Sequence, residues 1–172
     1  MTIEERIFNQ AKNGTAVNPG LPATLSSLLI AQAAHETADF TSPFFRNYNN
    51  AFGYSYIPGA RYQVGPGSLA DNGTPIAVYN SLEDSVKEII DWIYRRVADG
   101  KFPKDLSTIT TPEQYATLLR NSGYFTDSAT NYAAGIRSFF IQVMQDLEKP
   151  QAKVILLIVF SLAGYWLYKR RK

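Results

Sequence analysis

The stretch AQAAHETADFTSPFFRNYNNAFGYSY, residues 31–56, joins two parts of the chain that differ in character. It begins inside a predicted helix over residues 22–38. One face of that helix carries, at steps of three or four, Leu25, Leu29, Gln32 and Glu36. It then enters a segment, residues 43–80, that is rich in Gly, Pro, Asn and Tyr and shows no helical period. The sequence therefore predicts a helical part and a loop-rich part that meet just after Glu36.

Capping signals and apolar periodicity predict further helices. Thr2 and Glu5 form a capping-box pattern ahead of apolar residues at helical spacing, and Gly14 suits the end of that helix. Thr111 and Gln114 repeat the capping pattern. The remaining predicted helices cover about residues 81–97, 112–119 and 129–148.

Two short β-like pieces lie within the loop-rich part. RYQV at 61–64 and PIAVY at 75–79 flank the turn signal ADNG at 70–73, which predicts a small hairpin. The predicted fold class is therefore mainly α (α+β), a helical domain with a small β-hairpin lobe.

Composition and charge exclude several functions. The chain has no cysteine, so disulfides, zinc–thiolate sites and cysteine nucleophiles are ruled out. Five of the 17 Lys and Arg residues lie beyond residue 150, whereas all 15 acidic residues precede it. The first 150 residues thus carry a formal net charge of −3, and no specific nucleic-acid partner is predicted for them.

The C-terminal segment differs from the rest of the chain. Residues 154–168 contain no charge, and they are followed by the basic sequence KRRK. Lys153 can snorkel, and the late aromatic residues suit a membrane interface. A buried terminal helix of the fold is the alternative. We predict two domains, 1–149 and 150–172, the second a C-terminal transmembrane helix that anchors the chain to a lipid membrane in a single pass.

Glu36 is a candidate general acid. It ends the apolar face of its helix, where half-burial raises the pKa of a carboxyl group. A protonated carboxyl is what a glycosidic oxygen needs in order to leave. The alternative is that Glu36 merely faces water at the end of a helix.

His35 precedes Glu36 as in the zinc-protease pattern H-E-x-x-H. The fifth position is Asp39, however, and the chain contains no second histidine. No metal and no cofactor are therefore predicted. His35 is interpreted as a packed or hydrogen-bonded helix residue.

Aromatic and amide side chains gather in the loop-rich part. The aromatic residues are Tyr48, Phe52, Tyr54, Tyr56, Tyr62 and Tyr79. Sugars present apolar faces and polar rims, which tyrosines and amides suit. Taken singly, each of these rings also fits a core position. Asn49 and Asn50 can bind either the N-acetyl groups of a glycan or the local backbone.

Two separated blocks resemble the signature of bacterial glucosaminidases, glycoside hydrolase family 73. AQAAHETADFTS followed by NNAFGYS is similar to an AQ-A-x-x-ES helix, a serine six residues after the glutamate, and N-N-x-F-G-[I/M]-K. YATLLRNSGYFTDSATNYAAGI, residues 115–136, resembles Y-x-x-x-L-x-x-x-GY-x-TD-x-x-Y-x-x-x-[IL]. Order and spacing agree over about residues 22–143.

The resemblance implies a lysozyme-like helical domain with a small β-lobe that closes a peptidoglycan cleft. It implies that Glu36 is the catalytic acid, that Tyr124 lies near the reaction centre and that Gln32 orients Glu36. Substrate-binding positions predicted from the resemblance and from the aromatic pattern are Gln32, Asn49, Asn50, Phe52, Gly53, Tyr54 and Tyr56.

The chain also departs from the family pattern. Leu69 stands where the family often has a second glutamate, and the nearest carboxylate is Asp71, the predicted general base of an inverting mechanism. Asp39 is read as a residue that tunes Glu36. Asp39 and Phe40 replace the family's usual Trp and Gly. If neither aspartate is the base, one acid suffices for a transglycosylase-like route in which a hydroxyl of the sugar closes an anhydro ring.

The predicted function is a membrane-anchored peptidoglycan hydrolase that cleaves the N-acetylglucosaminyl-β-1,4-N-acetylmuramyl linkage by acid–base catalysis. The alternatives are a lytic transglycosylase or muramidase, and a non-catalytic glycan-binding structural protein. The small size and the tail favour a lytic protein of a phage virion, with virion proteins as partners, and a bacterial envelope protein is the alternative location.

Overall fold

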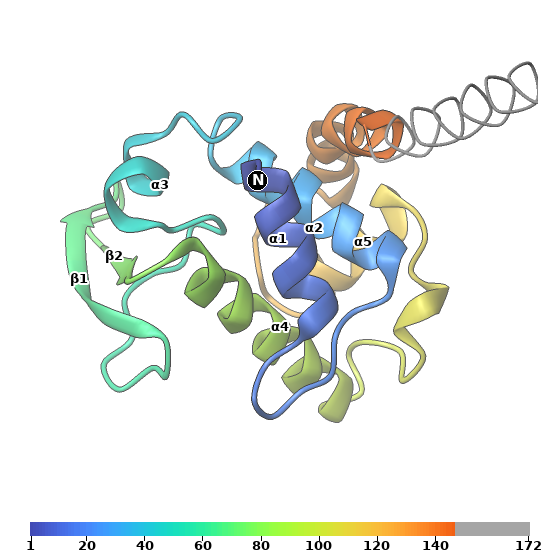
Figure 1. Ribbon diagram of the computed structural model, residues 1–172, viewed down its shortest axis with the longest axis horizontal. Coiled ribbons are helices and arrows are strands. Elements are labelled where there is room, and N and C mark those ends of the chain that lie inside the picture. Colours follow the sequence, from blue (N-terminus) through green and yellow to red (C-terminus); the bar gives the residue numbers. More distant parts are fainter. Residues whose placement is uncertain (147–172) are drawn as a thin grey trace, which may run out of the picture.

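The computed structural model describes residues 1–146 and arranges most of the helices around α2 (Figure 1). Its elements in chain order are α1 (Ile3–Asn13), α2 (Ala23–Glu36), α3 (Pro43–Tyr48), β1 (Gln63–Leu69), β2 (Pro75–Tyr79), α4 (Leu82–Ala98), the 3-10 turn η1 (Leu106–Thr108) and α5 (Pro112–Asn121). Residues 129–146 are also helical. The predicted boundary at residues 149 and 150 lies outside the described residues.

The central helix α2 is buried on nearly every side. Ten of its 14 residues are buried, which is expected of a helix that other helices surround. Glu36 is its last residue, so the candidate acid stands where the core opens towards the surface. The helix predicted at residues 22–38 is thus present, but it ends earlier than predicted, at Glu36.

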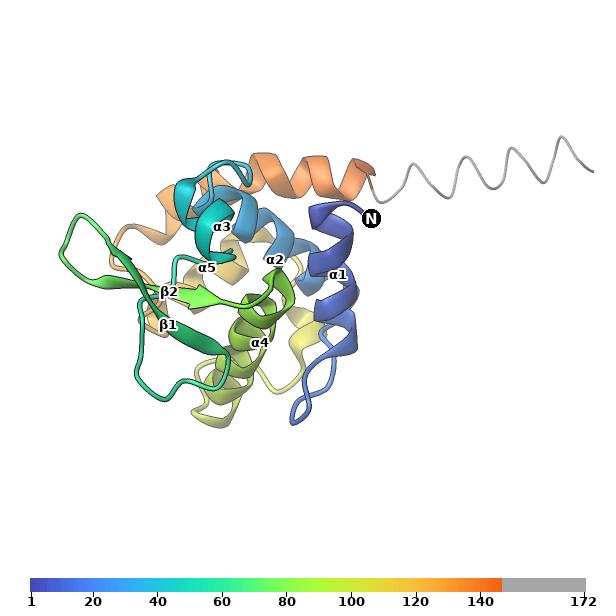
Figure 2. The ribbon, with the colours of Figure 1, turned by 60° about the vertical axis from the view of Figure 1, so that its left-hand side comes forward.

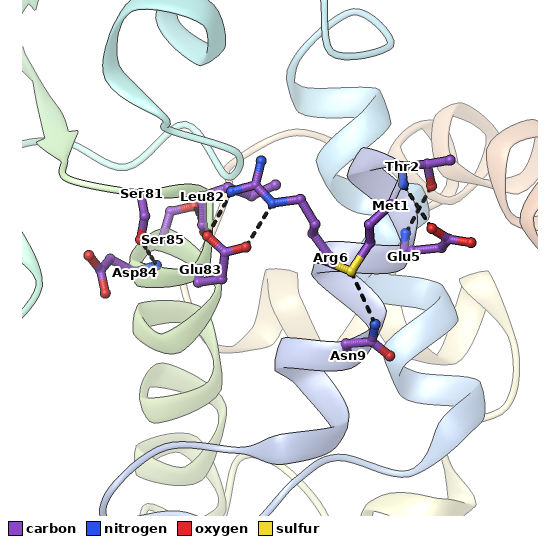
Figure 3. A network of polar contacts seen from close by, with 10 residues as sticks. All are labelled: Met1, Thr2, Glu5, Arg6, Asn9, Ser81, Leu82, Glu83, Asp84 and Ser85. Atoms are coloured by element: carbon purple, nitrogen blue, oxygen red, sulfur yellow. Dashed lines mark hydrogen bonds and ion pairs between the residues drawn. The ribbon is translucent and has the colours of Figure 1, made fainter.

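Capping fixes the ends of the shorter helices. The side chain of Thr2 accepts a hydrogen bond from the backbone N–H of Glu5, and the reciprocal bond is present (Figure 3). Thr111 and Gln114 form the same box at the start of α5. Both predicted capping boxes are therefore confirmed, and each satisfies backbone donors that the first helical turn leaves free.

An ion pair joins α1 to α4. Arg6 donates two hydrogen bonds to Glu83, from Nε to Oε1 at 2.7 Å and from Nη2 to Oε2 at 2.8 Å (Figure 3). The planar guanidinium and the carboxylate form a bidentate pair, and the two parallel hydrogen bonds fix the relative orientation of the two side chains. This pair ties the N-terminal helix to the helix that follows the hairpin.

The hairpin lobe stands at one edge of the molecule, beside the short helix α3 (Figures 1 and 2). The strands β1 and β2 pair antiparallel, with Gln63 opposite Tyr79 and Leu69 opposite Pro75. The predicted hairpin is confirmed. The short helix α3 lies within the segment that the sequence predicted to lack helical structure, so that part of the prediction was wrong.

Two buried carboxylates of α4 hold this lobe and the N-terminal loop. Glu88 accepts a hydrogen bond from Gln63 of β1 at 2.8 Å. Asp91 accepts bonds from Thr15, Asn18 and Tyr62 at 2.7–2.9 Å. The helix α4 therefore positions the base of the hairpin relative to the helical core.

The predicted transmembrane helix has to be corrected. Among residues 1–146, no helix is both long enough and apolar enough to cross a membrane. The segment predicted to do so, residues 154–168, lies outside the described residues. The fold class of the described chain is mainly helical with one small two-stranded sheet.

Candidate active site

The two carboxyl oxygens of Glu36 have different surroundings. Oε1 accepts a hydrogen bond from the hydroxyl of Tyr132 at 2.5 Å. Oε2 faces Gly53, where a side-chain carbon built on the glycine would lie only 3.6 Å from it. Gly53 is exposed and has a φ of 64°, a conformation that glycine adopts without strain. One oxygen is thus held by the protein, and the other faces an exposed turn.

Burial raises the pKa of Glu36 above that of a free glutamate. The hydrogen bond from Tyr132 favours the charged form and offsets part of that effect. The carboxyl group therefore keeps its proton to a higher pH than a solvent-exposed glutamate. That is the property that a general acid needs.

Tyr132 is itself fixed by its neighbours. Its ring stacks on Phe125 with the centroids 4.1 Å apart, and it meets the ring of His35 edge-on at 5.2 Å. Gly135 leaves the room that His35 occupies, since a side-chain carbon at Gly135 would lie 2.4 Å from Cε1 of the imidazole. His35 is thus a packed helix residue, as predicted. Its ring helps to position Tyr132, the residue that donates a hydrogen bond to Glu36.

Gln32 lies one turn before Glu36 and is completely buried. Its Oε1 accepts a hydrogen bond from the hydroxyl of Tyr115 at 2.6 Å. Tyr115, on α5, is also completely buried. The Gln32 side chain therefore belongs to a buried polar cluster behind the acid.

Tyr124 positions the backbone beside Glu36. Its hydroxyl donates a hydrogen bond to the carbonyl oxygen of Phe52 at 2.5 Å, immediately before Gly53. Its ring also contacts Tyr54 and Trp92 edge-on, at 6.0 and 5.4 Å. The structure thus brings Tyr124, Phe52, Gly53 and Glu36 together, with the hydroxyl of Tyr124 bound to the carbonyl of Phe52, and the catalytic role of Tyr124 stays a prediction.

The two asparagines bind the backbone. Asn50 is 1% exposed, and its amide nitrogen donates to the carbonyls of Tyr54 and Ala77, while its oxygen accepts from the N–H of Tyr54. Asn49 donates to the carbonyl of Tyr79 at 3.1 Å. Both amides therefore fasten the loop that follows α3 to β2. Their contact with substrate stays a prediction.

The other predicted substrate-binding residues differ in exposure. Phe52 is buried in the core, and the hydroxyl of Tyr54 is buried without a hydrogen-bond partner. Tyr56 is half-buried, and its backbone N–H donates to the carbonyl of Pro75. Gly53 and Tyr56 are thus the members of this set that reach the surface most directly.

The predicted acidic partners lie elsewhere. Asp71 is exposed in the turn between β1 and β2, which projects away from the helices (Figure 2). Asp39 is exposed just after α2. Among the described residues, no carboxylate is a cause of the Glu36 pKa shift, which comes from burial and from Tyr132. No group of acidic or histidine side chains in residues 1–146 has the arrangement to hold a metal ion.

The backbone that follows Glu36 is unusual. Ala38, Asp39 and Phe40 have φ angles of 48°, 55° and 61°, in the left-handed region. This region costs a residue other than glycine about 1 kcal/mol or more. The hydroxyl of Thr37 accepts from the N–H of Phe40 and donates to the carbonyl of Ala33, which holds the turn in place. The departure from the family's Trp and Gly therefore falls on a strained turn beside the acid.

Tyr132 and Tyr115 are site residues that sequence reasoning missed. Tyr132 was predicted only as an inward-facing residue of its helix. Both tyrosines are present in the second motif block, whose pattern has a tyrosine at the position of Tyr115 and another two residues before Tyr132. That signal could have identified them, because a polar ring at an inward position needs a partner for its hydroxyl.

A helical domain with a small hairpin and a protonatable carboxyl at the end of its central helix defines the class of lysozyme-like glycoside hydrolases. The chain belongs to the glucosaminidase family, described as mannosyl-glycoprotein endo-beta-N-acetylglucosaminidase, which matches residues 21–145. It is a glycoside hydrolase of the endo-β-N-acetylglucosaminidase type. The resemblance predicted from the two motif blocks is confirmed.

Solved structures share the fold at low sequence identity. The glycoside hydrolase domain from Salmonella typhimurium FlgJ is 22% identical, with a TM-score of 0.59 over 92% of this chain and 98% of that one. A peptidoglycan hydrolase from Sphingomonas sp. A1 is 19% identical, with a TM-score of 0.57 over 86% and 88%. A chain of a type VI secretion system effector-immunity complex from Pseudomonas protegens is 21% identical, with a TM-score of 0.55 over 83% and 84%. No curated protein sequence matches the chain.

Proposed function

We propose that the protein hydrolyses the glycan strand of peptidoglycan, at the N-acetylglucosaminyl-β-1,4-N-acetylmuramyl linkage, with Glu36 as the general acid. The observation that carries this proposal is the Glu36 carboxyl group, which is half-buried, has a pKa raised by desolvation and presents Oε2 towards Gly53. Family membership supplies the reaction type. A structural neighbour described as a peptidoglycan hydrolase supports the choice of substrate.

The chemistry follows from the two oxygens of Glu36. Because Oε1 accepts from Tyr132, the acidic proton resides on Oε2. Glu36 transfers that proton to the glycosidic oxygen as the bond from this oxygen to the anomeric carbon breaks. Water then adds to the anomeric carbon and gives its proton to a base. Glu36 is left as a carboxylate, and the hydrogen bond from Tyr132 stabilises its charge.

The base is the second part of the proposal. We assign it to Asp71, whose exposed place on the hairpin turn leaves it free to approach a bound glycan strand. Inverting glycosidases hold their two carboxyl groups about 6.5–9.5 Å apart, so that a water molecule fits between them. Movement of the hairpin towards α2 would be required to reach that separation.

A transglycosylase-like reaction is the second candidate. One observation favours it, since no carboxylate of residues 1–146 perturbs the pKa of Glu36. In that reaction a hydroxyl of the muramyl sugar attacks its own anomeric carbon, and no protein base activates water. A muramidase that cuts the alternate bond uses the same acid.

Mass spectrometry of digested peptidoglycan distinguishes these reactions. The proposal predicts products with reducing N-acetylglucosamine ends. Anhydro-muramyl ends would establish the transglycosylase reaction, and reducing muramyl ends would establish the muramidase. Intact glycan strands after incubation with folded protein would contradict the choice of substrate. The location in a virion or in a cell envelope stays a prediction.

A further inference from the structure

The direction of the Tyr124 ring depends on side-chain contacts. Tyr124 lies between α5 and the helical residues 129–146, on a connection that forms no helix or strand. Its backbone N–H donates to the carbonyl of Leu119 at 3.0 Å, and Gly123 before it has a φ of 78°. This turn fixes the backbone but leaves the side chain several staggered orientations. The neighbours of the ring therefore decide where its hydroxyl points.

Two rings of the described chain meet that of Tyr124 edge-on, and they differ as supports. The ring of Tyr54 lies 6.0 Å away between centroids, in the loop whose Phe52 carbonyl the Tyr124 hydroxyl holds at 2.5 Å. A residue of the held loop moves together with that loop. The ring of Trp92 lies closer, at 5.4 Å, and belongs to α4. Trp92 therefore supports Tyr124 from outside the loop.

The Trp92 ring is held by two further contacts. The ring of Phe102, a buried residue, meets it edge-on at 5.9 Å. The guanidinium of Arg96, one helical turn later, lies 5.6 Å from its centroid and pairs with Asp99 at 3.0 Å. An aromatic edge and a cation over a ring face are both favourable contacts. The indole is thus a fixed surface against which Tyr124 packs.

Helix α4 also carries an anchor of the hairpin. Glu88, one turn before Trp92, accepts the hydrogen bond from Gln63 of β1. Positions four residues apart lie on the same face of a helix. One face of α4 therefore supports the base of the hairpin through Glu88, and through Trp92 it supports the tyrosine that holds the loop.

We propose that Trp92 is a positioning residue for the loop beside Glu36. It keeps the Tyr124 hydroxyl on the Phe52 carbonyl, and this bond fixes the Phe52–Gly53 peptide opposite Oε2. The inference rests on the proposed role of Glu36 as the general acid.

The planarity of the peptide carries the effect to the acid. In a trans peptide, a bond that holds the Phe52 carbonyl also sets the direction of the Gly53 N–H. Gly53 faces Oε2 of Glu36, where a side-chain carbon on the glycine would lie 3.6 Å from that oxygen. Trp92 thereby shapes the place at which the glycosidic oxygen receives its proton.

Loss of the indole should slow the reaction. Trp92→Leu removes the aromatic edge beside Tyr124, so that the hydroxyl no longer stays on the Phe52 carbonyl. A misplacement of 1 Å costs on the order of 10²-fold in rate, and we expect kcat/KM to fall by about 10–10²-fold. The fall should lie in kcat, because Oε2 gives up its proton in the transition state.

The test compares Trp92→Leu, Trp92→Phe, Tyr124→Phe and the double variant Trp92→Leu/Tyr124→Phe in the full chain. The measurements are kcat, KM and the NMR shift of the Phe52 carbonyl carbon, which reports its hydrogen bond and needs no activity. In Trp92→Leu this shift should move towards its value in Tyr124→Phe, which lacks the hydroxyl. Trp92→Phe keeps an aromatic edge and should restore most of the shift and of kcat. The double variant should match Tyr124→Phe alone, because Trp92 acts through Tyr124.

The matched control is Tyr94→Leu, which removes another half-buried ring from α4. It should leave the Phe52 carbonyl shift and kcat in place even if Tm falls. An unmoved carbonyl shift in folded Trp92→Leu would overturn the proposal, as would additive losses in the double variant. If Trp92→Leu does not fold, Trp92→Met is measured instead, and an unmoved shift there has the same consequence. Turnover by Glu36→Gln would contradict the acid assignment and is a separate outcome, since the carbonyl shift does not depend on it.

Discussion

The hydroxyl of Tyr132 donates a hydrogen bond to Oε1 of Glu36 at 2.5 Å, across 96 positions of the sequence. Glu36 ends the central helix, and Tyr132 belongs to the helical residues 129–146. This bond assigns different roles to the two carboxyl oxygens of the acid. The last helix of the described chain is therefore part of the candidate active site as well as of the core.

Gly135→Ala tests how that helix is seated. The new methyl group would overlap the His35 ring, which lies against Tyr132. We expect a loss of stability of about 1–3 kcal/mol, as for other overpacked sites, together with reduced turnover. Urea unfolding checks the stability, and the exposed position Ser138→Ala on the same helix is the control. Equal midpoints for the two variants would show that the close approach of Gly135 to His35 does not matter.

Glu36→Gln should stabilise the protein in a pH-dependent way. The pKa of Glu36 is raised in the folded state, so any advantage of its neutral form is complete below the unfolded pKa and is lost as the pH rises through the folded pKa. Glutamine stays neutral throughout. The gain in Tm of Glu36→Gln over the wild type should therefore be larger at pH 8 than at pH 4. A gain that is independent of pH, or larger in acid, would contradict burial as the cause of the shift.

Glu83→Gln should show the opposite pH dependence. The hydrogen bonds from Arg6 lower the pKa of Glu83, so its contribution to stability is present above the unfolded pKa and is lost as the pH falls through the folded pKa. We expect a loss of about 0.5–1 kcal/mol at pH 7, since the pair is partly exposed. A double-mutant cycle with Arg6→Gln isolates the coupling. A coupling of zero at pH 7 would mean that the pair between α1 and α4 contributes nothing.

Asp71→Asn tests the proposed base. Because Asp71 is exposed in a turn, the substitution should leave Tm unchanged while hydrolysis falls steeply and glycan binding persists. Asp39→Asn, at the other candidate carboxylate, is measured beside it under the same conditions. Undiminished release of reducing ends by Asp71→Asn would exclude it as the base. A loss confined to Asp39→Asn would transfer the role to that residue.

Local signals allowed several elements to be predicted from the sequence. Thr2, Glu5, Thr111 and Gln114 were predictable because a capping box is formed by residues that are close in sequence. The short α3 was missed because six residues are too few to show a helical period. Its Ser42 cap and Pro43 in the first turn were nevertheless present as signals.

The contacts within the site were less predictable. Glu36 could be selected from its helical face, but nothing local indicates that Tyr132 reaches it or that Tyr115 reaches Gln32. Such partners are brought together by tertiary packing over long sequence distances. The Asn50 amide likewise had two readings in the sequence, and the structure shows it bound to the backbone of the loop and of β2.

The central claim is that Glu36 supplies the proton for glycosidic cleavage, and one comparison tests it most directly. Purified peptidoglycan is digested with Glu36→Gln and with Glu88→Gln, and new reducing ends are counted. Glu88 is a matched control, because burial raises its pKa too, and its carboxylate accepts a hydrogen bond from Gln63 of the hairpin, whereas that of Glu36 accepts one from Tyr132. The account predicts a loss of about 10²–10⁴ in rate for Glu36→Gln and retained turnover for Glu88→Gln. Near-normal release of reducing ends by folded Glu36→Gln would contradict it.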